Sequence, residues 1–572
     1  MYNKTNENYM RWMNSSKVSN SDKELLKNMD EATKDNAFFK DIEFGTAGMR
    51  GVLGPGTNRM NLFTIRKATV AFGMYLLKFH QHADRKGVAI SHDNRHMSRE
   101  FALECSKILN DMGIKTYLFD SLRPTPELSF AVRYKKCDGG IMITASHNPK
   151  EYNGYKVYDE NGCQLVPMQL EPLLRIINTL PNELDVEVPL NDKKGEQIIL
   201  ENDVDDEYVK LCESIQERPE LNKKGFKIVY TPNHGTSYVN AMRVFKDCGY
   251  EVYPVLKQCS FDPDFSETLS PNPESKDAFI EPIKLAKEID ADLICMTDPD
   301  GDRVGLACKL ENGEYELLTG NESASLLTDY LFEARKEKNT LTRDGVLFST
   351  VVSSDLPTKI AKSYGITTEK FLTGFKYIGE RIRYYEIHNG PKYEFGFEES
   401  YGCLPSPFVR DKDGIQAILL YCEMALFYHL KGLNLVEAYK NLGKKFGYHK
   451  AKVFDVYLKG SEGASLMKSI MDTLINKPLE NIGDKKVRIY EDYFNKKRFV
   501  KENGTVEEIK NLPVGDLVKF YLEDGSTICV RPSGTEPKIK FYVECVDKLP
   551  RDLSSKCEDY YKQLLKQLNV NI

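Results

Sequence analysis

The stretch LICMTDPDGDR, residues 293–303, decides how the rest of the chain is interpreted. Its apolar first part, residues 293–296, predicts a buried strand, and a tight Pro/Gly loop follows it. Asp298, Asp300 and Asp302 occupy alternate positions in that loop. Loops at the carboxyl ends of strands are where open α/β sheets bind ligands, and carboxylate oxygens suit Mg²⁺. The stretch therefore predicts an α/β chain with a magnesium site.

The same loop has two other interpretations. An EF-hand loop also begins with aspartates at alternate positions, but it needs Gly at its sixth position and Glu at its twelfth. Arg303 and Lys309 occupy those positions, which excludes an EF-hand. An Asp-rich surface turn is the plain alternative. Three aspartates directly after an apolar strand favour the metal site over that turn.

Strand and helix patterns alternate on both sides of this loop, which predicts βαβ units and a mainly parallel sheet. The predicted strands are 88–91, 114–119, 140–144, 227–230, 293–297, 346–351 and 370–372. The predicted helices are 62–80, 98–109, 205–215, 237–248, 322–335 and 356–363, with a core helix over 417–430. Ser21 and Glu24 form an S-x-x-E pattern that predicts the start of the first helix. We therefore expect three α/β blocks in series.

The last part of the chain has a different pattern and predicts a smaller α+β domain. Its predicted elements are strands near 452–458, 487–490, 517–521, 527–530 and 539–546 and a closing helix at 553–569. Polar joints are expected near 182–205, 313–320 and 444–450. The expected domains are 1–203, 204–319, 320–446 and 447–572.

Composition excludes several classes of function. The 572 residues carry 79 Lys and Arg against 85 Asp and Glu, a net charge of −6. A chain this acidic is a poor general binder of nucleic acid, because neutralising phosphates needs clustered basic residues. The longest apolar stretch, 417–430, contains Glu423 and His429 and is too short to span a bilayer. Residues 1–12 lack the apolar core of a secretory signal, and the 13 cysteines show no C-x-x-C spacing, so we expect a cytoplasmic protein.

A second motif, TASHNP over 144–149, also follows an apolar strand, so Ser146 is predicted at the ligand edge of a sheet. Direct adjacency makes His147 a poor base for Ser146, because neighbouring side chains are expected to diverge. The G-x-S-x-G pattern of a hydrolase nucleophile elbow is absent. A simple turn is the alternative for this motif on its own.

Four further loops carry residues suited to phosphates or sugars. RPSGTEPK over 531–538 combines two hydroxyls, an Arg and a Lys, which suits an anion nest, with a polar hairpin loop as an equal alternative. GFEESYG over 396–402 offers carboxylates and a hydroxyl to sugar hydroxyl groups. TGFK over 373–376 follows a predicted strand, and FGTAGMRG over 44–51 is a Gly-rich loop with one Arg. Each of these signals is weak alone.

Together and in order, the loops resemble the motifs of the α-D-phosphohexomutase superfamily. The series is FGTAGMRG, TASHNP, NGYK, DPDGDR, TGFK, GFEESYG and RPSGTEPK, and it covers nearly the whole chain. TGFKYIG and GFEESYG are most similar to the phosphoglucomutase/phosphopentomutase branch. The resemblance implies an α/β fold with four domains around a central cleft, of which three are related mixed-sheet domains and the fourth is a smaller C-terminal α+β domain.

The resemblance also implies roles for individual residues. Ser146 matches the serine that carries the phosphoryl group, and either Lys156 or His147 matches a general acid/base. Arg50 and Arg303 match arginines near the transferring group. The implied metal ligands are Asp298, Asp300, Asp302 and a phosphoserine oxygen of Ser146. The implied substrate contacts are Thr373, Gly374, Lys376, Glu398, Ser400 and, for the second phosphate, Arg531, Ser533, Gly534 and Thr535.

The activity that the resemblance implies is an isomerase of carbohydrate metabolism. It would interconvert glucose 1-phosphate and glucose 6-phosphate through a phosphoserine enzyme and a glucose 1,6-bisphosphate intermediate. Mg²⁺ and that bisphosphate are the implied cofactors, and sugar phosphates are the implied partners, without nucleic acid or membrane. A monomer or a weak homodimer is expected.

Related activities stay open. Phosphopentomutase comes first, then phosphomannomutase and glucose-1,6-bisphosphate synthase, because 373–379 and 396–402 do not discriminate between these substrates. Cys403 stands where an aromatic residue is expected. A Mg²⁺-dependent sugar phosphatase is the rival from another class, and the second phosphate loop at 531–538 favours a mutase over it. Intact Ser146 and the three intact aspartates argue against an inactive sugar-phosphate-binding protein.

Overall fold

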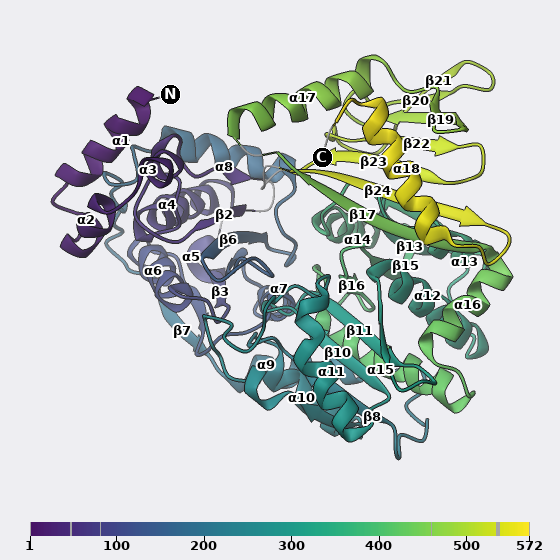
Figure 1. Ribbon diagram of the computed structural model, residues 1–572. Coiled ribbons are helices and arrows are strands. Elements are labelled where there is room, and N and C mark those ends of the chain that lie inside the picture. Colours follow the sequence, from purple (N-terminus) through teal and green to yellow (C-terminus); the bar gives the residue numbers. More distant parts are fainter. Residues whose placement is uncertain (1, 46–47, 81, 459, 534–537, 571–572) are drawn as a thin grey trace. The chain divides into compact units, whose positions relative to one another are not determined.

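The computed structural model describes residues 2–45, 48–80, 82–458, 460–533 and 538–570 (Figure 1). The chain divides into two compact units. The first contains Met1–Gly320 and Gly374–Lys431, and the second contains Asn321–Thr373 and Gly432–Ile572. The segment expected as a third domain, 320–446, contributes to both units.

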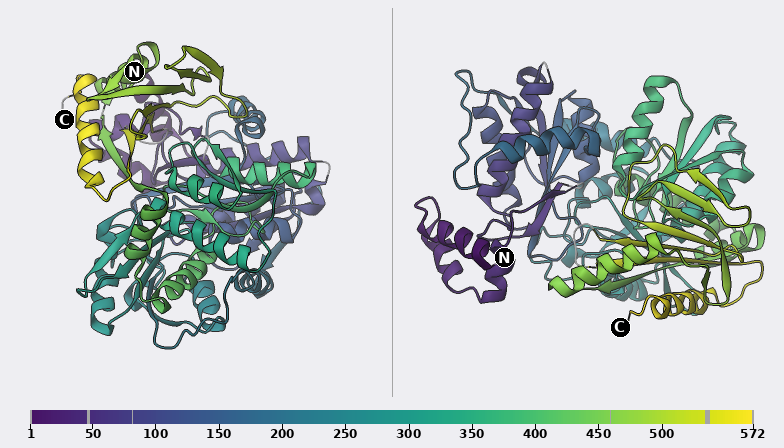
Figure 2. Two further views of the ribbon diagram at one scale, coloured as in Figure 1. Left: turned by 90° about the vertical axis from the view of Figure 1, so that its right-hand side faces the viewer. Right: turned by 90° about the horizontal axis from the view of Figure 1, so that it is seen from above.

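Three short helices open the first unit: α1 (Tyr2–Asn14), α2 (Asn20–Lys27) and α3 (Glu31–Phe38) (Figure 2). Their buried side chains, among them Trp12 and Phe38, form a small apolar cluster together with Leu184 and Phe63. The predicted helix start at Ser21 is wrong. The Ser19 hydroxyl instead accepts from the Asp22 N–H at 3.0 Å, so Ser19 caps α2 and Ser21 lies inside the helix.

The first large sheet has seven strands in the order β1-β2-β6-β5-β3-β4-β7. The bounds are β1 (Phe44–Gly45), β2 (Gly48–Val52), β3 (Val88–His92), β4 (Thr116–Phe119), β5 (Gly139–Ile143), β6 (Tyr152–Asp159) and β7 (Gln197–Leu200). Strands β3, β4, β5 and β7 run parallel, whereas β6 is antiparallel to β5 and β2. The sheet is therefore mixed, and the sequence pattern alone missed β6 and its antiparallel edge.

Helices cover both faces of this sheet. They are α4 (Leu62–Phe79), α5 (Ala83–Lys86), α6 (Ser98–Asp111), α7 (Thr125–Tyr134) and α8 (Pro167–Thr179). Successive residues of β5 point to opposite faces. A side chain at Gly139 would meet Phe72 of α4 at 3.0 Å, and one at Gly140 would meet Val132 of α7 at 2.7 Å. The two glycines therefore allow α4 and α7 to approach β5 closely from opposite sides.

The second sheet has the order β12-β11-β10-β8-β9, in which β10 is parallel to β8 and antiparallel to β11. The strands are β8 (Lys227–Thr231), β9 (Glu251–Pro254), β10 (Leu293–Thr297), β11 (Val304–Lys309) and β12 (Tyr315–Leu318). The helices are α9 (Asn202–Glu213), α10 (Tyr238–Asp247), η1 (Leu256–Gln258), η2 (Lys276–Phe279) and α11 (Ile280–Ile289). Strand β10 is buried throughout, as its apolar sequence predicts.

The remaining segment of the first unit supplies two helices and a short antiparallel pair. These are α14 (Lys376–His388), β15 (Lys392–Phe397), β16 (Cys403–Leu404) and α15 (Gly414–Leu430). The Asp413 carboxylate caps α15 by accepting from two backbone N–H groups. Helix α15 packs against α9, α10 and β10. The predicted core helix over 417–430 is therefore confirmed.

The second unit begins with α12 (Gly320–Glu337), β13 (Gly345–Thr350), α13 (Leu356–Ser363), β14 (Thr367–Phe371) and α16 (Leu435–Phe446). Strands β13 and β14 are parallel. The C-terminal sheet is antiparallel and has the order β17-β24-β23-β22-β19-β20-β21. Its elements are β17 (Tyr448–Tyr457), α17 (Gly460–Asn476), β18 (Asn481–Ile482), β19 (Lys485–Asp492), β20 (Lys497–Val500), β21 (Thr505–Glu508), β22 (Val518–Leu522), β23 (Thr527–Pro532), β24 (Lys538–Asp547) and α18 (Leu553–Gln567). The closing helix α18 lies along β17 and β24 (Figures 1 and 2).

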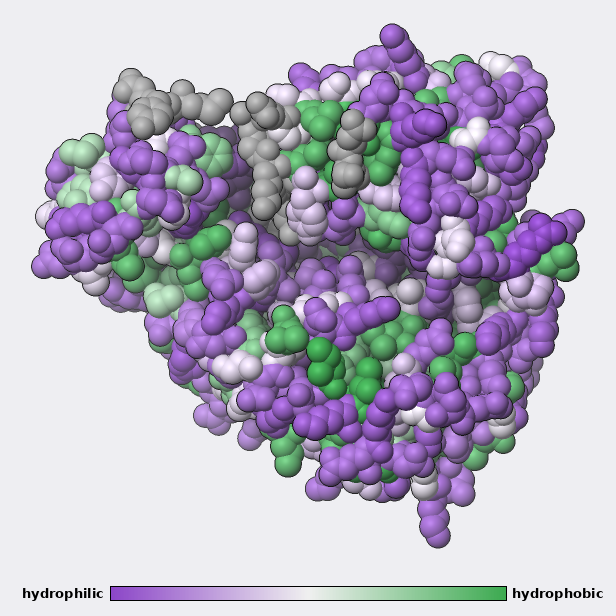
Figure 3. All heavy atoms as spheres, viewed as in Figure 1, coloured by the Kyte–Doolittle hydropathy of each residue, from purple (hydrophilic) through white to green (hydrophobic). Residues whose placement is uncertain are grey.

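The side chains at the surface are mostly hydrophilic, as expected for a chain with this many charged residues. On the face shown in Figure 3, hydrophilic side chains dominate and apolar ones lie between them. Among the described residues, no helix combines the length and the apolar character needed to cross a membrane.

Candidate active site

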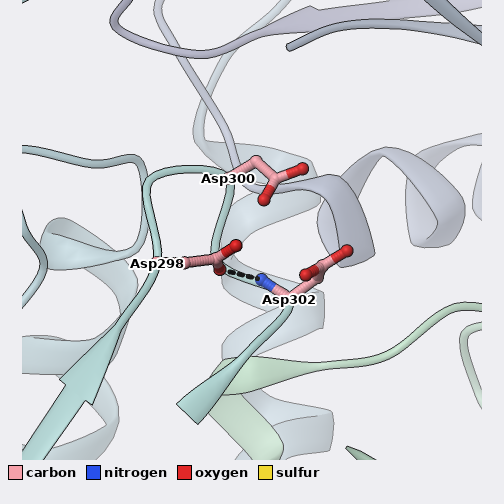
Figure 4. Close-up of side chains that lie close together, drawn as sticks. All are labelled: Asp298, Asp300 and Asp302. Carbon is pink, nitrogen blue, oxygen red and sulfur yellow. Dashed lines mark hydrogen bonds between the residues drawn. The ribbon is translucent and has the colours of Figure 1, made fainter. Parts of the chain in front are cut away.

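The three aspartates of the opening motif converge at the end of β10. Gly301 has a φ of +71°, which lets the loop reverse direction directly after Asp300. The Asp298 carboxylate accepts from the backbone N–H of Asp302 at 3.0 Å (Figure 4). It also accepts from the backbone N–H of Arg303 at 3.0 Å. All three carboxylates are buried, and one oxygen of each lies within 4.8 Å of the others. The three carboxylates therefore lie close enough together to share one ion.

Two oxygens of this cluster are left without a donor. Oδ2 of Asp300 accepts from Lys156 Nζ at 2.9 Å and from Thr125 Oγ1 at 3.0 Å. Oδ1 of Asp300 and Oδ1 of Asp302 are buried and have no hydrogen-bond partner among the residues that the structure describes. A buried carboxylate oxygen without a donor is costly unless a cation occupies the space beside it. The donor set, all hard oxygens, fits a divalent cation such as Mg²⁺.

The three carboxylates of the cluster repel one another, and a neighbouring lysine offsets part of this repulsion. Burial, reinforced by the charges of Asp300 and Asp302, raises the pKa of Asp298. Burial also works to raise the pKa of Asp300, but Lys156, Asp298 and Lys412 together outweigh it and hold that pKa below its ordinary value. A bound cation reverses such repulsion, because it becomes the largest local charge. The cluster therefore has the electrostatics of a metal site rather than of a surface turn.

Ser146 reaches this cluster from the first sheet. It lies three residues beyond the end of β5 and has a φ of +52°, which a residue with a side chain seldom adopts. Its backbone N–H donates to Thr144 Oγ1 at 2.8 Å, and its hydroxyl donates to Asp298 Oδ2 at 2.9 Å. The structure thus brings together the two motifs that the sequence placed at the ends of two different strands.

The expectation that His147 points away from Ser146 is wrong. His147 Nδ1 lies 3.2 Å from Ser146 Oγ. The left-handed backbone at Ser146 turns the two side chains to the same side, which an extended or helical backbone would not do. Burial, together with the charges of Arg303 and Arg50, holds the pKa of His147 well below its ordinary value. The imidazole is therefore neutral, but the same effects that lower its pKa also make it a weak proton acceptor.

Three predicted cationic residues surround these groups. Lys156, on β6, is buried and bonded to Asp300. Arg50, on β2, donates to Asn148 Oδ1 at 2.9 Å in the Ser146 loop. Arg303 forms an ion pair with Glu274 at 3.0 Å. These positions give an anionic group beside Ser146 several cationic neighbours.

The GFEESYG and TGFK loops meet inside the first unit. Glu398 Oε1 accepts from the backbone N–H of Gly374 at 2.8 Å, and Gly374 has a φ of +117°. Lys376 begins α14 and is buried, and burial lowers its pKa to about 8. Ser400 lies half-buried in the turn between β15 and β16. Thr373 belongs to the second unit.

Sequence reasoning missed Lys412. Its ammonium lies 3.1 Å from Asp302, 3.1 Å from Asp411 and 3.9 Å from Glu398. Burial works to lower the pKa of Lys412, but Asp302 and Asp411 outweigh it and raise that pKa. Lys412 thus joins the aspartate cluster to the Glu398 loop. No motif marks it in the sequence, and the only local signal is its place directly before the Asp413 cap of α15.

The proposed second phosphate loop lies in the second unit. Arg531, near the end of β23, stands opposite Lys540 of β24 and is half-buried. The backbone N–H of Ser533 donates to the carbonyl of Lys538 at 2.8 Å. Gly534 and Thr535 lie outside the described residues.

Comparison with known proteins gives a consistent result along the chain. Four family models match: phosphoglucomutase/phosphomannomutase alpha/beta/alpha domains I, II and III at residues 41–183, 206–312 and 319–446, and the C-terminal domain at 479–549. A phosphoglucomutase of Staphylococcus haemolyticus is 36% identical over 94% of this chain and 95% of its own. One of Staphylococcus epidermidis is 37% identical over 88% of this chain and 90% of its own.

Solved structures show the same fold at lower identity. Parafusin, a phosphoglucomutase from Paramecium, covers 92% of this chain and 94% of its own with a TM-score of 0.67 and 19% identity. A phosphoglucomutase/phosphomannomutase family protein from Burkholderia thailandensis covers 92% of this chain and 97% of its own with a TM-score of 0.65 and 17% identity. With four matched domain models and relatives above 30% identity over most of the chain, this protein belongs to the phosphoglucomutase/phosphomannomutase family.

Proposed function

We propose that this protein is a phosphoglucomutase that interconverts glucose 1-phosphate and glucose 6-phosphate. The observation that carries the proposal is the 2.9 Å hydrogen bond from Ser146 Oγ to Asp298, beside two buried carboxylate oxygens that lack donors. A serine nucleophile and a cation site in direct contact are what phosphoryl transfer needs. Relatives that are 34–37% identical and are named phosphoglucomutases support the choice of substrate.

The proposal assigns Ser146 as the carrier of the phosphoryl group. In the phosphorylated enzyme, a sugar hydroxyl attacks the phosphorus, the bond to Ser146 Oγ breaks, and glucose 1,6-bisphosphate forms. When that intermediate reacts through its other phosphate, Ser146 is phosphorylated again and the isomer is released. Asp298, Asp300 and Asp302, with a phosphoserine oxygen, would hold Mg²⁺. The ion, when bound, supplies positive charge to the transferring phosphoryl oxygens.

Residues of the chain do the remaining work. Arg50 and Arg303 neutralise charge that develops in the loose, anionic transition state of phosphoryl transfer. His147 and Lys156 are the two candidates for taking the proton of the attacking hydroxyl. The His147 imidazole is neutral and lies 3.2 Å from Ser146 Oγ, but its lowered pKa makes it a weak base. The Lys156 ammonium is bonded to Asp300 and would have to lose a proton before it could act as a base.

The same proposal assigns the substrate contacts. Thr373, Gly374, Lys376, Glu398 and Ser400 would bind the sugar hydroxyls and nearby phosphate oxygens. Arg531, Ser533, Gly534 and Thr535 would hold the phosphate that is not being transferred. We also propose that the chain is divided into four domains, at residues 1–203, 204–319, 320–446 and 447–572. A second phosphate site favours a mutase over a phosphatase, which needs only one.

The test is an isomerisation assay with glucose 1-phosphate, Mg²⁺ and a trace of glucose 1,6-bisphosphate, run beside Ser146→Ala. We expect glucose 6-phosphate from the parent and none above background from the variant. Ribose 1-phosphate and mannose 1-phosphate run in parallel compare kcat/KM among the related activities. Release of inorganic phosphate at the rate of substrate loss would identify a phosphatase instead. Full activity of Ser146→Ala would overturn the proposal.

A further inference from the structure

Arg95 packs against the Ser146 loop, residues 144–152, and binds its backbone carbonyls. Its Nη2 donates to the carbonyls of Ser146 and Asn148, at 2.6 Å and 2.5 Å. Its Nη1 donates to the carbonyls of Pro149 and Tyr152, at 2.7 Å and 3.1 Å. The Arg95 side chain is buried. One guanidinium therefore fixes four carbonyl groups of a single loop.

The loop needs such a partner because of its conformation. Ser146 is left-handed, so the chain around it cannot form a regular ladder of backbone hydrogen bonds. Carbonyls that turn inward must then find donors elsewhere. A guanidinium offers five N–H donors in one rigid plane, whereas an ammonium offers three from a single point.

Arg95 is itself held in place from two sides. Asp93 Oδ2 lies 3.2 Å from Arg95 Nε, and Asp93 Oδ1 accepts from the Arg95 backbone N–H at 3.0 Å. The same Oδ1 also accepts from the hydroxyl of Ser98 at 2.6 Å, at the start of α6. The guanidinium is thus anchored to the segment that joins β3 to α6, within the first sheet.

A loop of the second sheet covers the other side of Arg95. The ring of Phe265 lies 5.1 Å from the guanidinium carbon, which is the geometry of a cation–π contact. Phe265 is buried and has a φ of +51°, an unusual backbone conformation for a bulky aromatic residue. Asn94 Nδ2 donates to the carbonyl of Asp262 at 2.9 Å and joins the same loop to the Arg95 segment.

We propose that Arg95, held by Asp93 and Phe265, is a positioning residue that keeps the Ser146 hydroxyl in the orientation required for phosphoryl transfer. The inference rests on the proposed function but adds a residue that lies outside every motif used to reach it. Arg95 contacts backbone carbonyls and touches neither the three aspartates nor the sugar loops. Its effect should therefore be on the reaction rate rather than on substrate binding.

The test is Arg95→Lys, which keeps the positive charge and loses the planar set of N–H donors that binds the four carbonyls. We expect kcat for glucose 1-phosphate to fall about 10²-fold with little change in KM, since misplacing a reacting group by about 1 Å costs that much. Arg59→Lys is the matched control. Arg59 is also buried and also donates to backbone carbonyls, those of Asn36 and Asn58, but it donates to no carbonyl of the Ser146 loop and reaches that segment only through the charge interaction with the Tyr152 side chain. Its kcat should stay within about twofold of the parent, as expected for a site away from the chemistry.

Two further measurements do not depend on turnover. Backbone amide hydrogen exchange over residues 144–152 should speed up in Arg95→Lys and not in Arg59→Lys. Intact mass after incubation with glucose 1,6-bisphosphate should show slower phosphorylation of Ser146. A third measurement returns to turnover: guanidinium added to Arg95→Ala should restore part of the lost rate, which a purely structural defect would not allow.

The outcomes separate the two proposals. If the parent enzyme does not isomerise glucose 1-phosphate, the proposed function fails, and the exchange experiment still tests the role of Arg95. If Arg95→Lys keeps kcat within threefold, or raises KM alone, or leaves exchange over 144–152 unchanged, the positioning role is wrong. Should Arg95→Lys not fold, Phe265→Leu keeps the guanidinium and is expected to lower kcat several-fold, with the same rise in exchange.

Discussion

Two buried polar clusters, one in each unit, look alike in composition and differ in how completely their oxygens are bonded. In the second unit, Glu544 accepts from the Ser354 hydroxyl at 2.5 Å, from His449 Nδ1 at 2.8 Å and from the Asp355 N–H at 3.1 Å. His449 Nε2 in turn lies 2.9 Å from Lys359 Nζ. Both carboxylate oxygens of Glu544 have partners.

The cluster of the first unit is incomplete by the same measure. Asp300 and Asp302 each keep one buried oxygen without a donor among the described residues, and the pKa of Asp298 is raised by burial and by those two neighbours. A complete network stabilises the fold around it, whereas each unbonded buried group needs an explanation. At Asp300 and Asp302 the unbonded oxygens occur together with the convergence of three carboxylates within 4.8 Å, which distinguishes a candidate cation site from a structural network.

The largest expected effect is on the incomplete cluster. Asp298→Asn keeps an oxygen to accept from the loop N–H groups but removes one negative charge from the metal site. We expect kcat to fall about 10²- to 10³-fold, the usual loss when a group stabilising developing charge is removed. The Mg²⁺ concentration for half-maximal activity should rise. Asp290→Asn, an exposed acid paired with Lys309, is the control and should behave like the parent. An unchanged Mg²⁺ dependence in Asp298→Asn would show that the incomplete cluster is not the metal site.

A somewhat smaller effect is expected at the link between the cluster and the sugar loop. Lys412→Met removes the ammonium that lies near Asp302 and Glu398. We expect activity to fall about 10- to 100-fold, as for other groups that orient metal ligands. Lys287→Met serves as a control, because Lys287 pairs with Glu314 on the surface. Equal activities of the two variants would show that Lys412 has no part in the site.

The complete cluster should respond in stability rather than in activity. Glu544→Gln loses charge-assisted hydrogen bonds to His449 and Ser354, which is expected to cost about 2 kcal/mol in the free energy of unfolding. Urea denaturation and amide exchange in β24 measure it. The exposed Glu508 of β21 provides Glu508→Gln as the control. A large loss of kcat without loss of stability would reverse the roles assigned to the two clusters.

The smallest effect is a dependence on pH. Burial lowers the pKa of Lys376 to about 8, so the ammonium is charged below that pH and neutral above it. If Lys376 binds a phosphate oxygen, KM should rise about threefold between pH 7 and pH 9, the size of a screened ion pair. Because the folded pKa lies below the unfolded one, the Lys376 contribution to stability rises with pH over the same range and beyond. Lys376→Arg keeps its charge and should show a flat KM profile.

The sequence predicts the parts of the site that each lie on one short segment. The apolar run before Asp298 and the one before Ser146 place both residues at strand ends, and the structure agrees. Most helices and strands of the α/β blocks fall within a few residues of their predicted bounds. The cap at Ser21 was misplaced because several serines near it offer competing caps, and Ser19 with Asp22 forms the bond instead.

What the sequence could not predict depends on contacts between distant segments. Thr125 and Asp300 are 175 positions apart, and Arg95 and Ser146 are 51 apart. No local pattern distinguishes such a residue from one on the surface. The approach of His147 to Ser146 was missed for another reason, since it depends on the sign of one backbone dihedral angle.

The left-handed backbone at Ser146 also restricts which nucleophile this loop can carry. Threonine has the same hydroxyl chemistry, but its branched Cβ makes a positive φ strongly unfavourable. Asparagine and aspartate tolerate this conformation but supply no hydroxyl. Serine thus meets two requirements: it has a hydroxyl group, and its Cβ is not branched. The backbone conformation of the turn therefore limits which hydroxyl-bearing residue can stand at position 146, independently of the substrate.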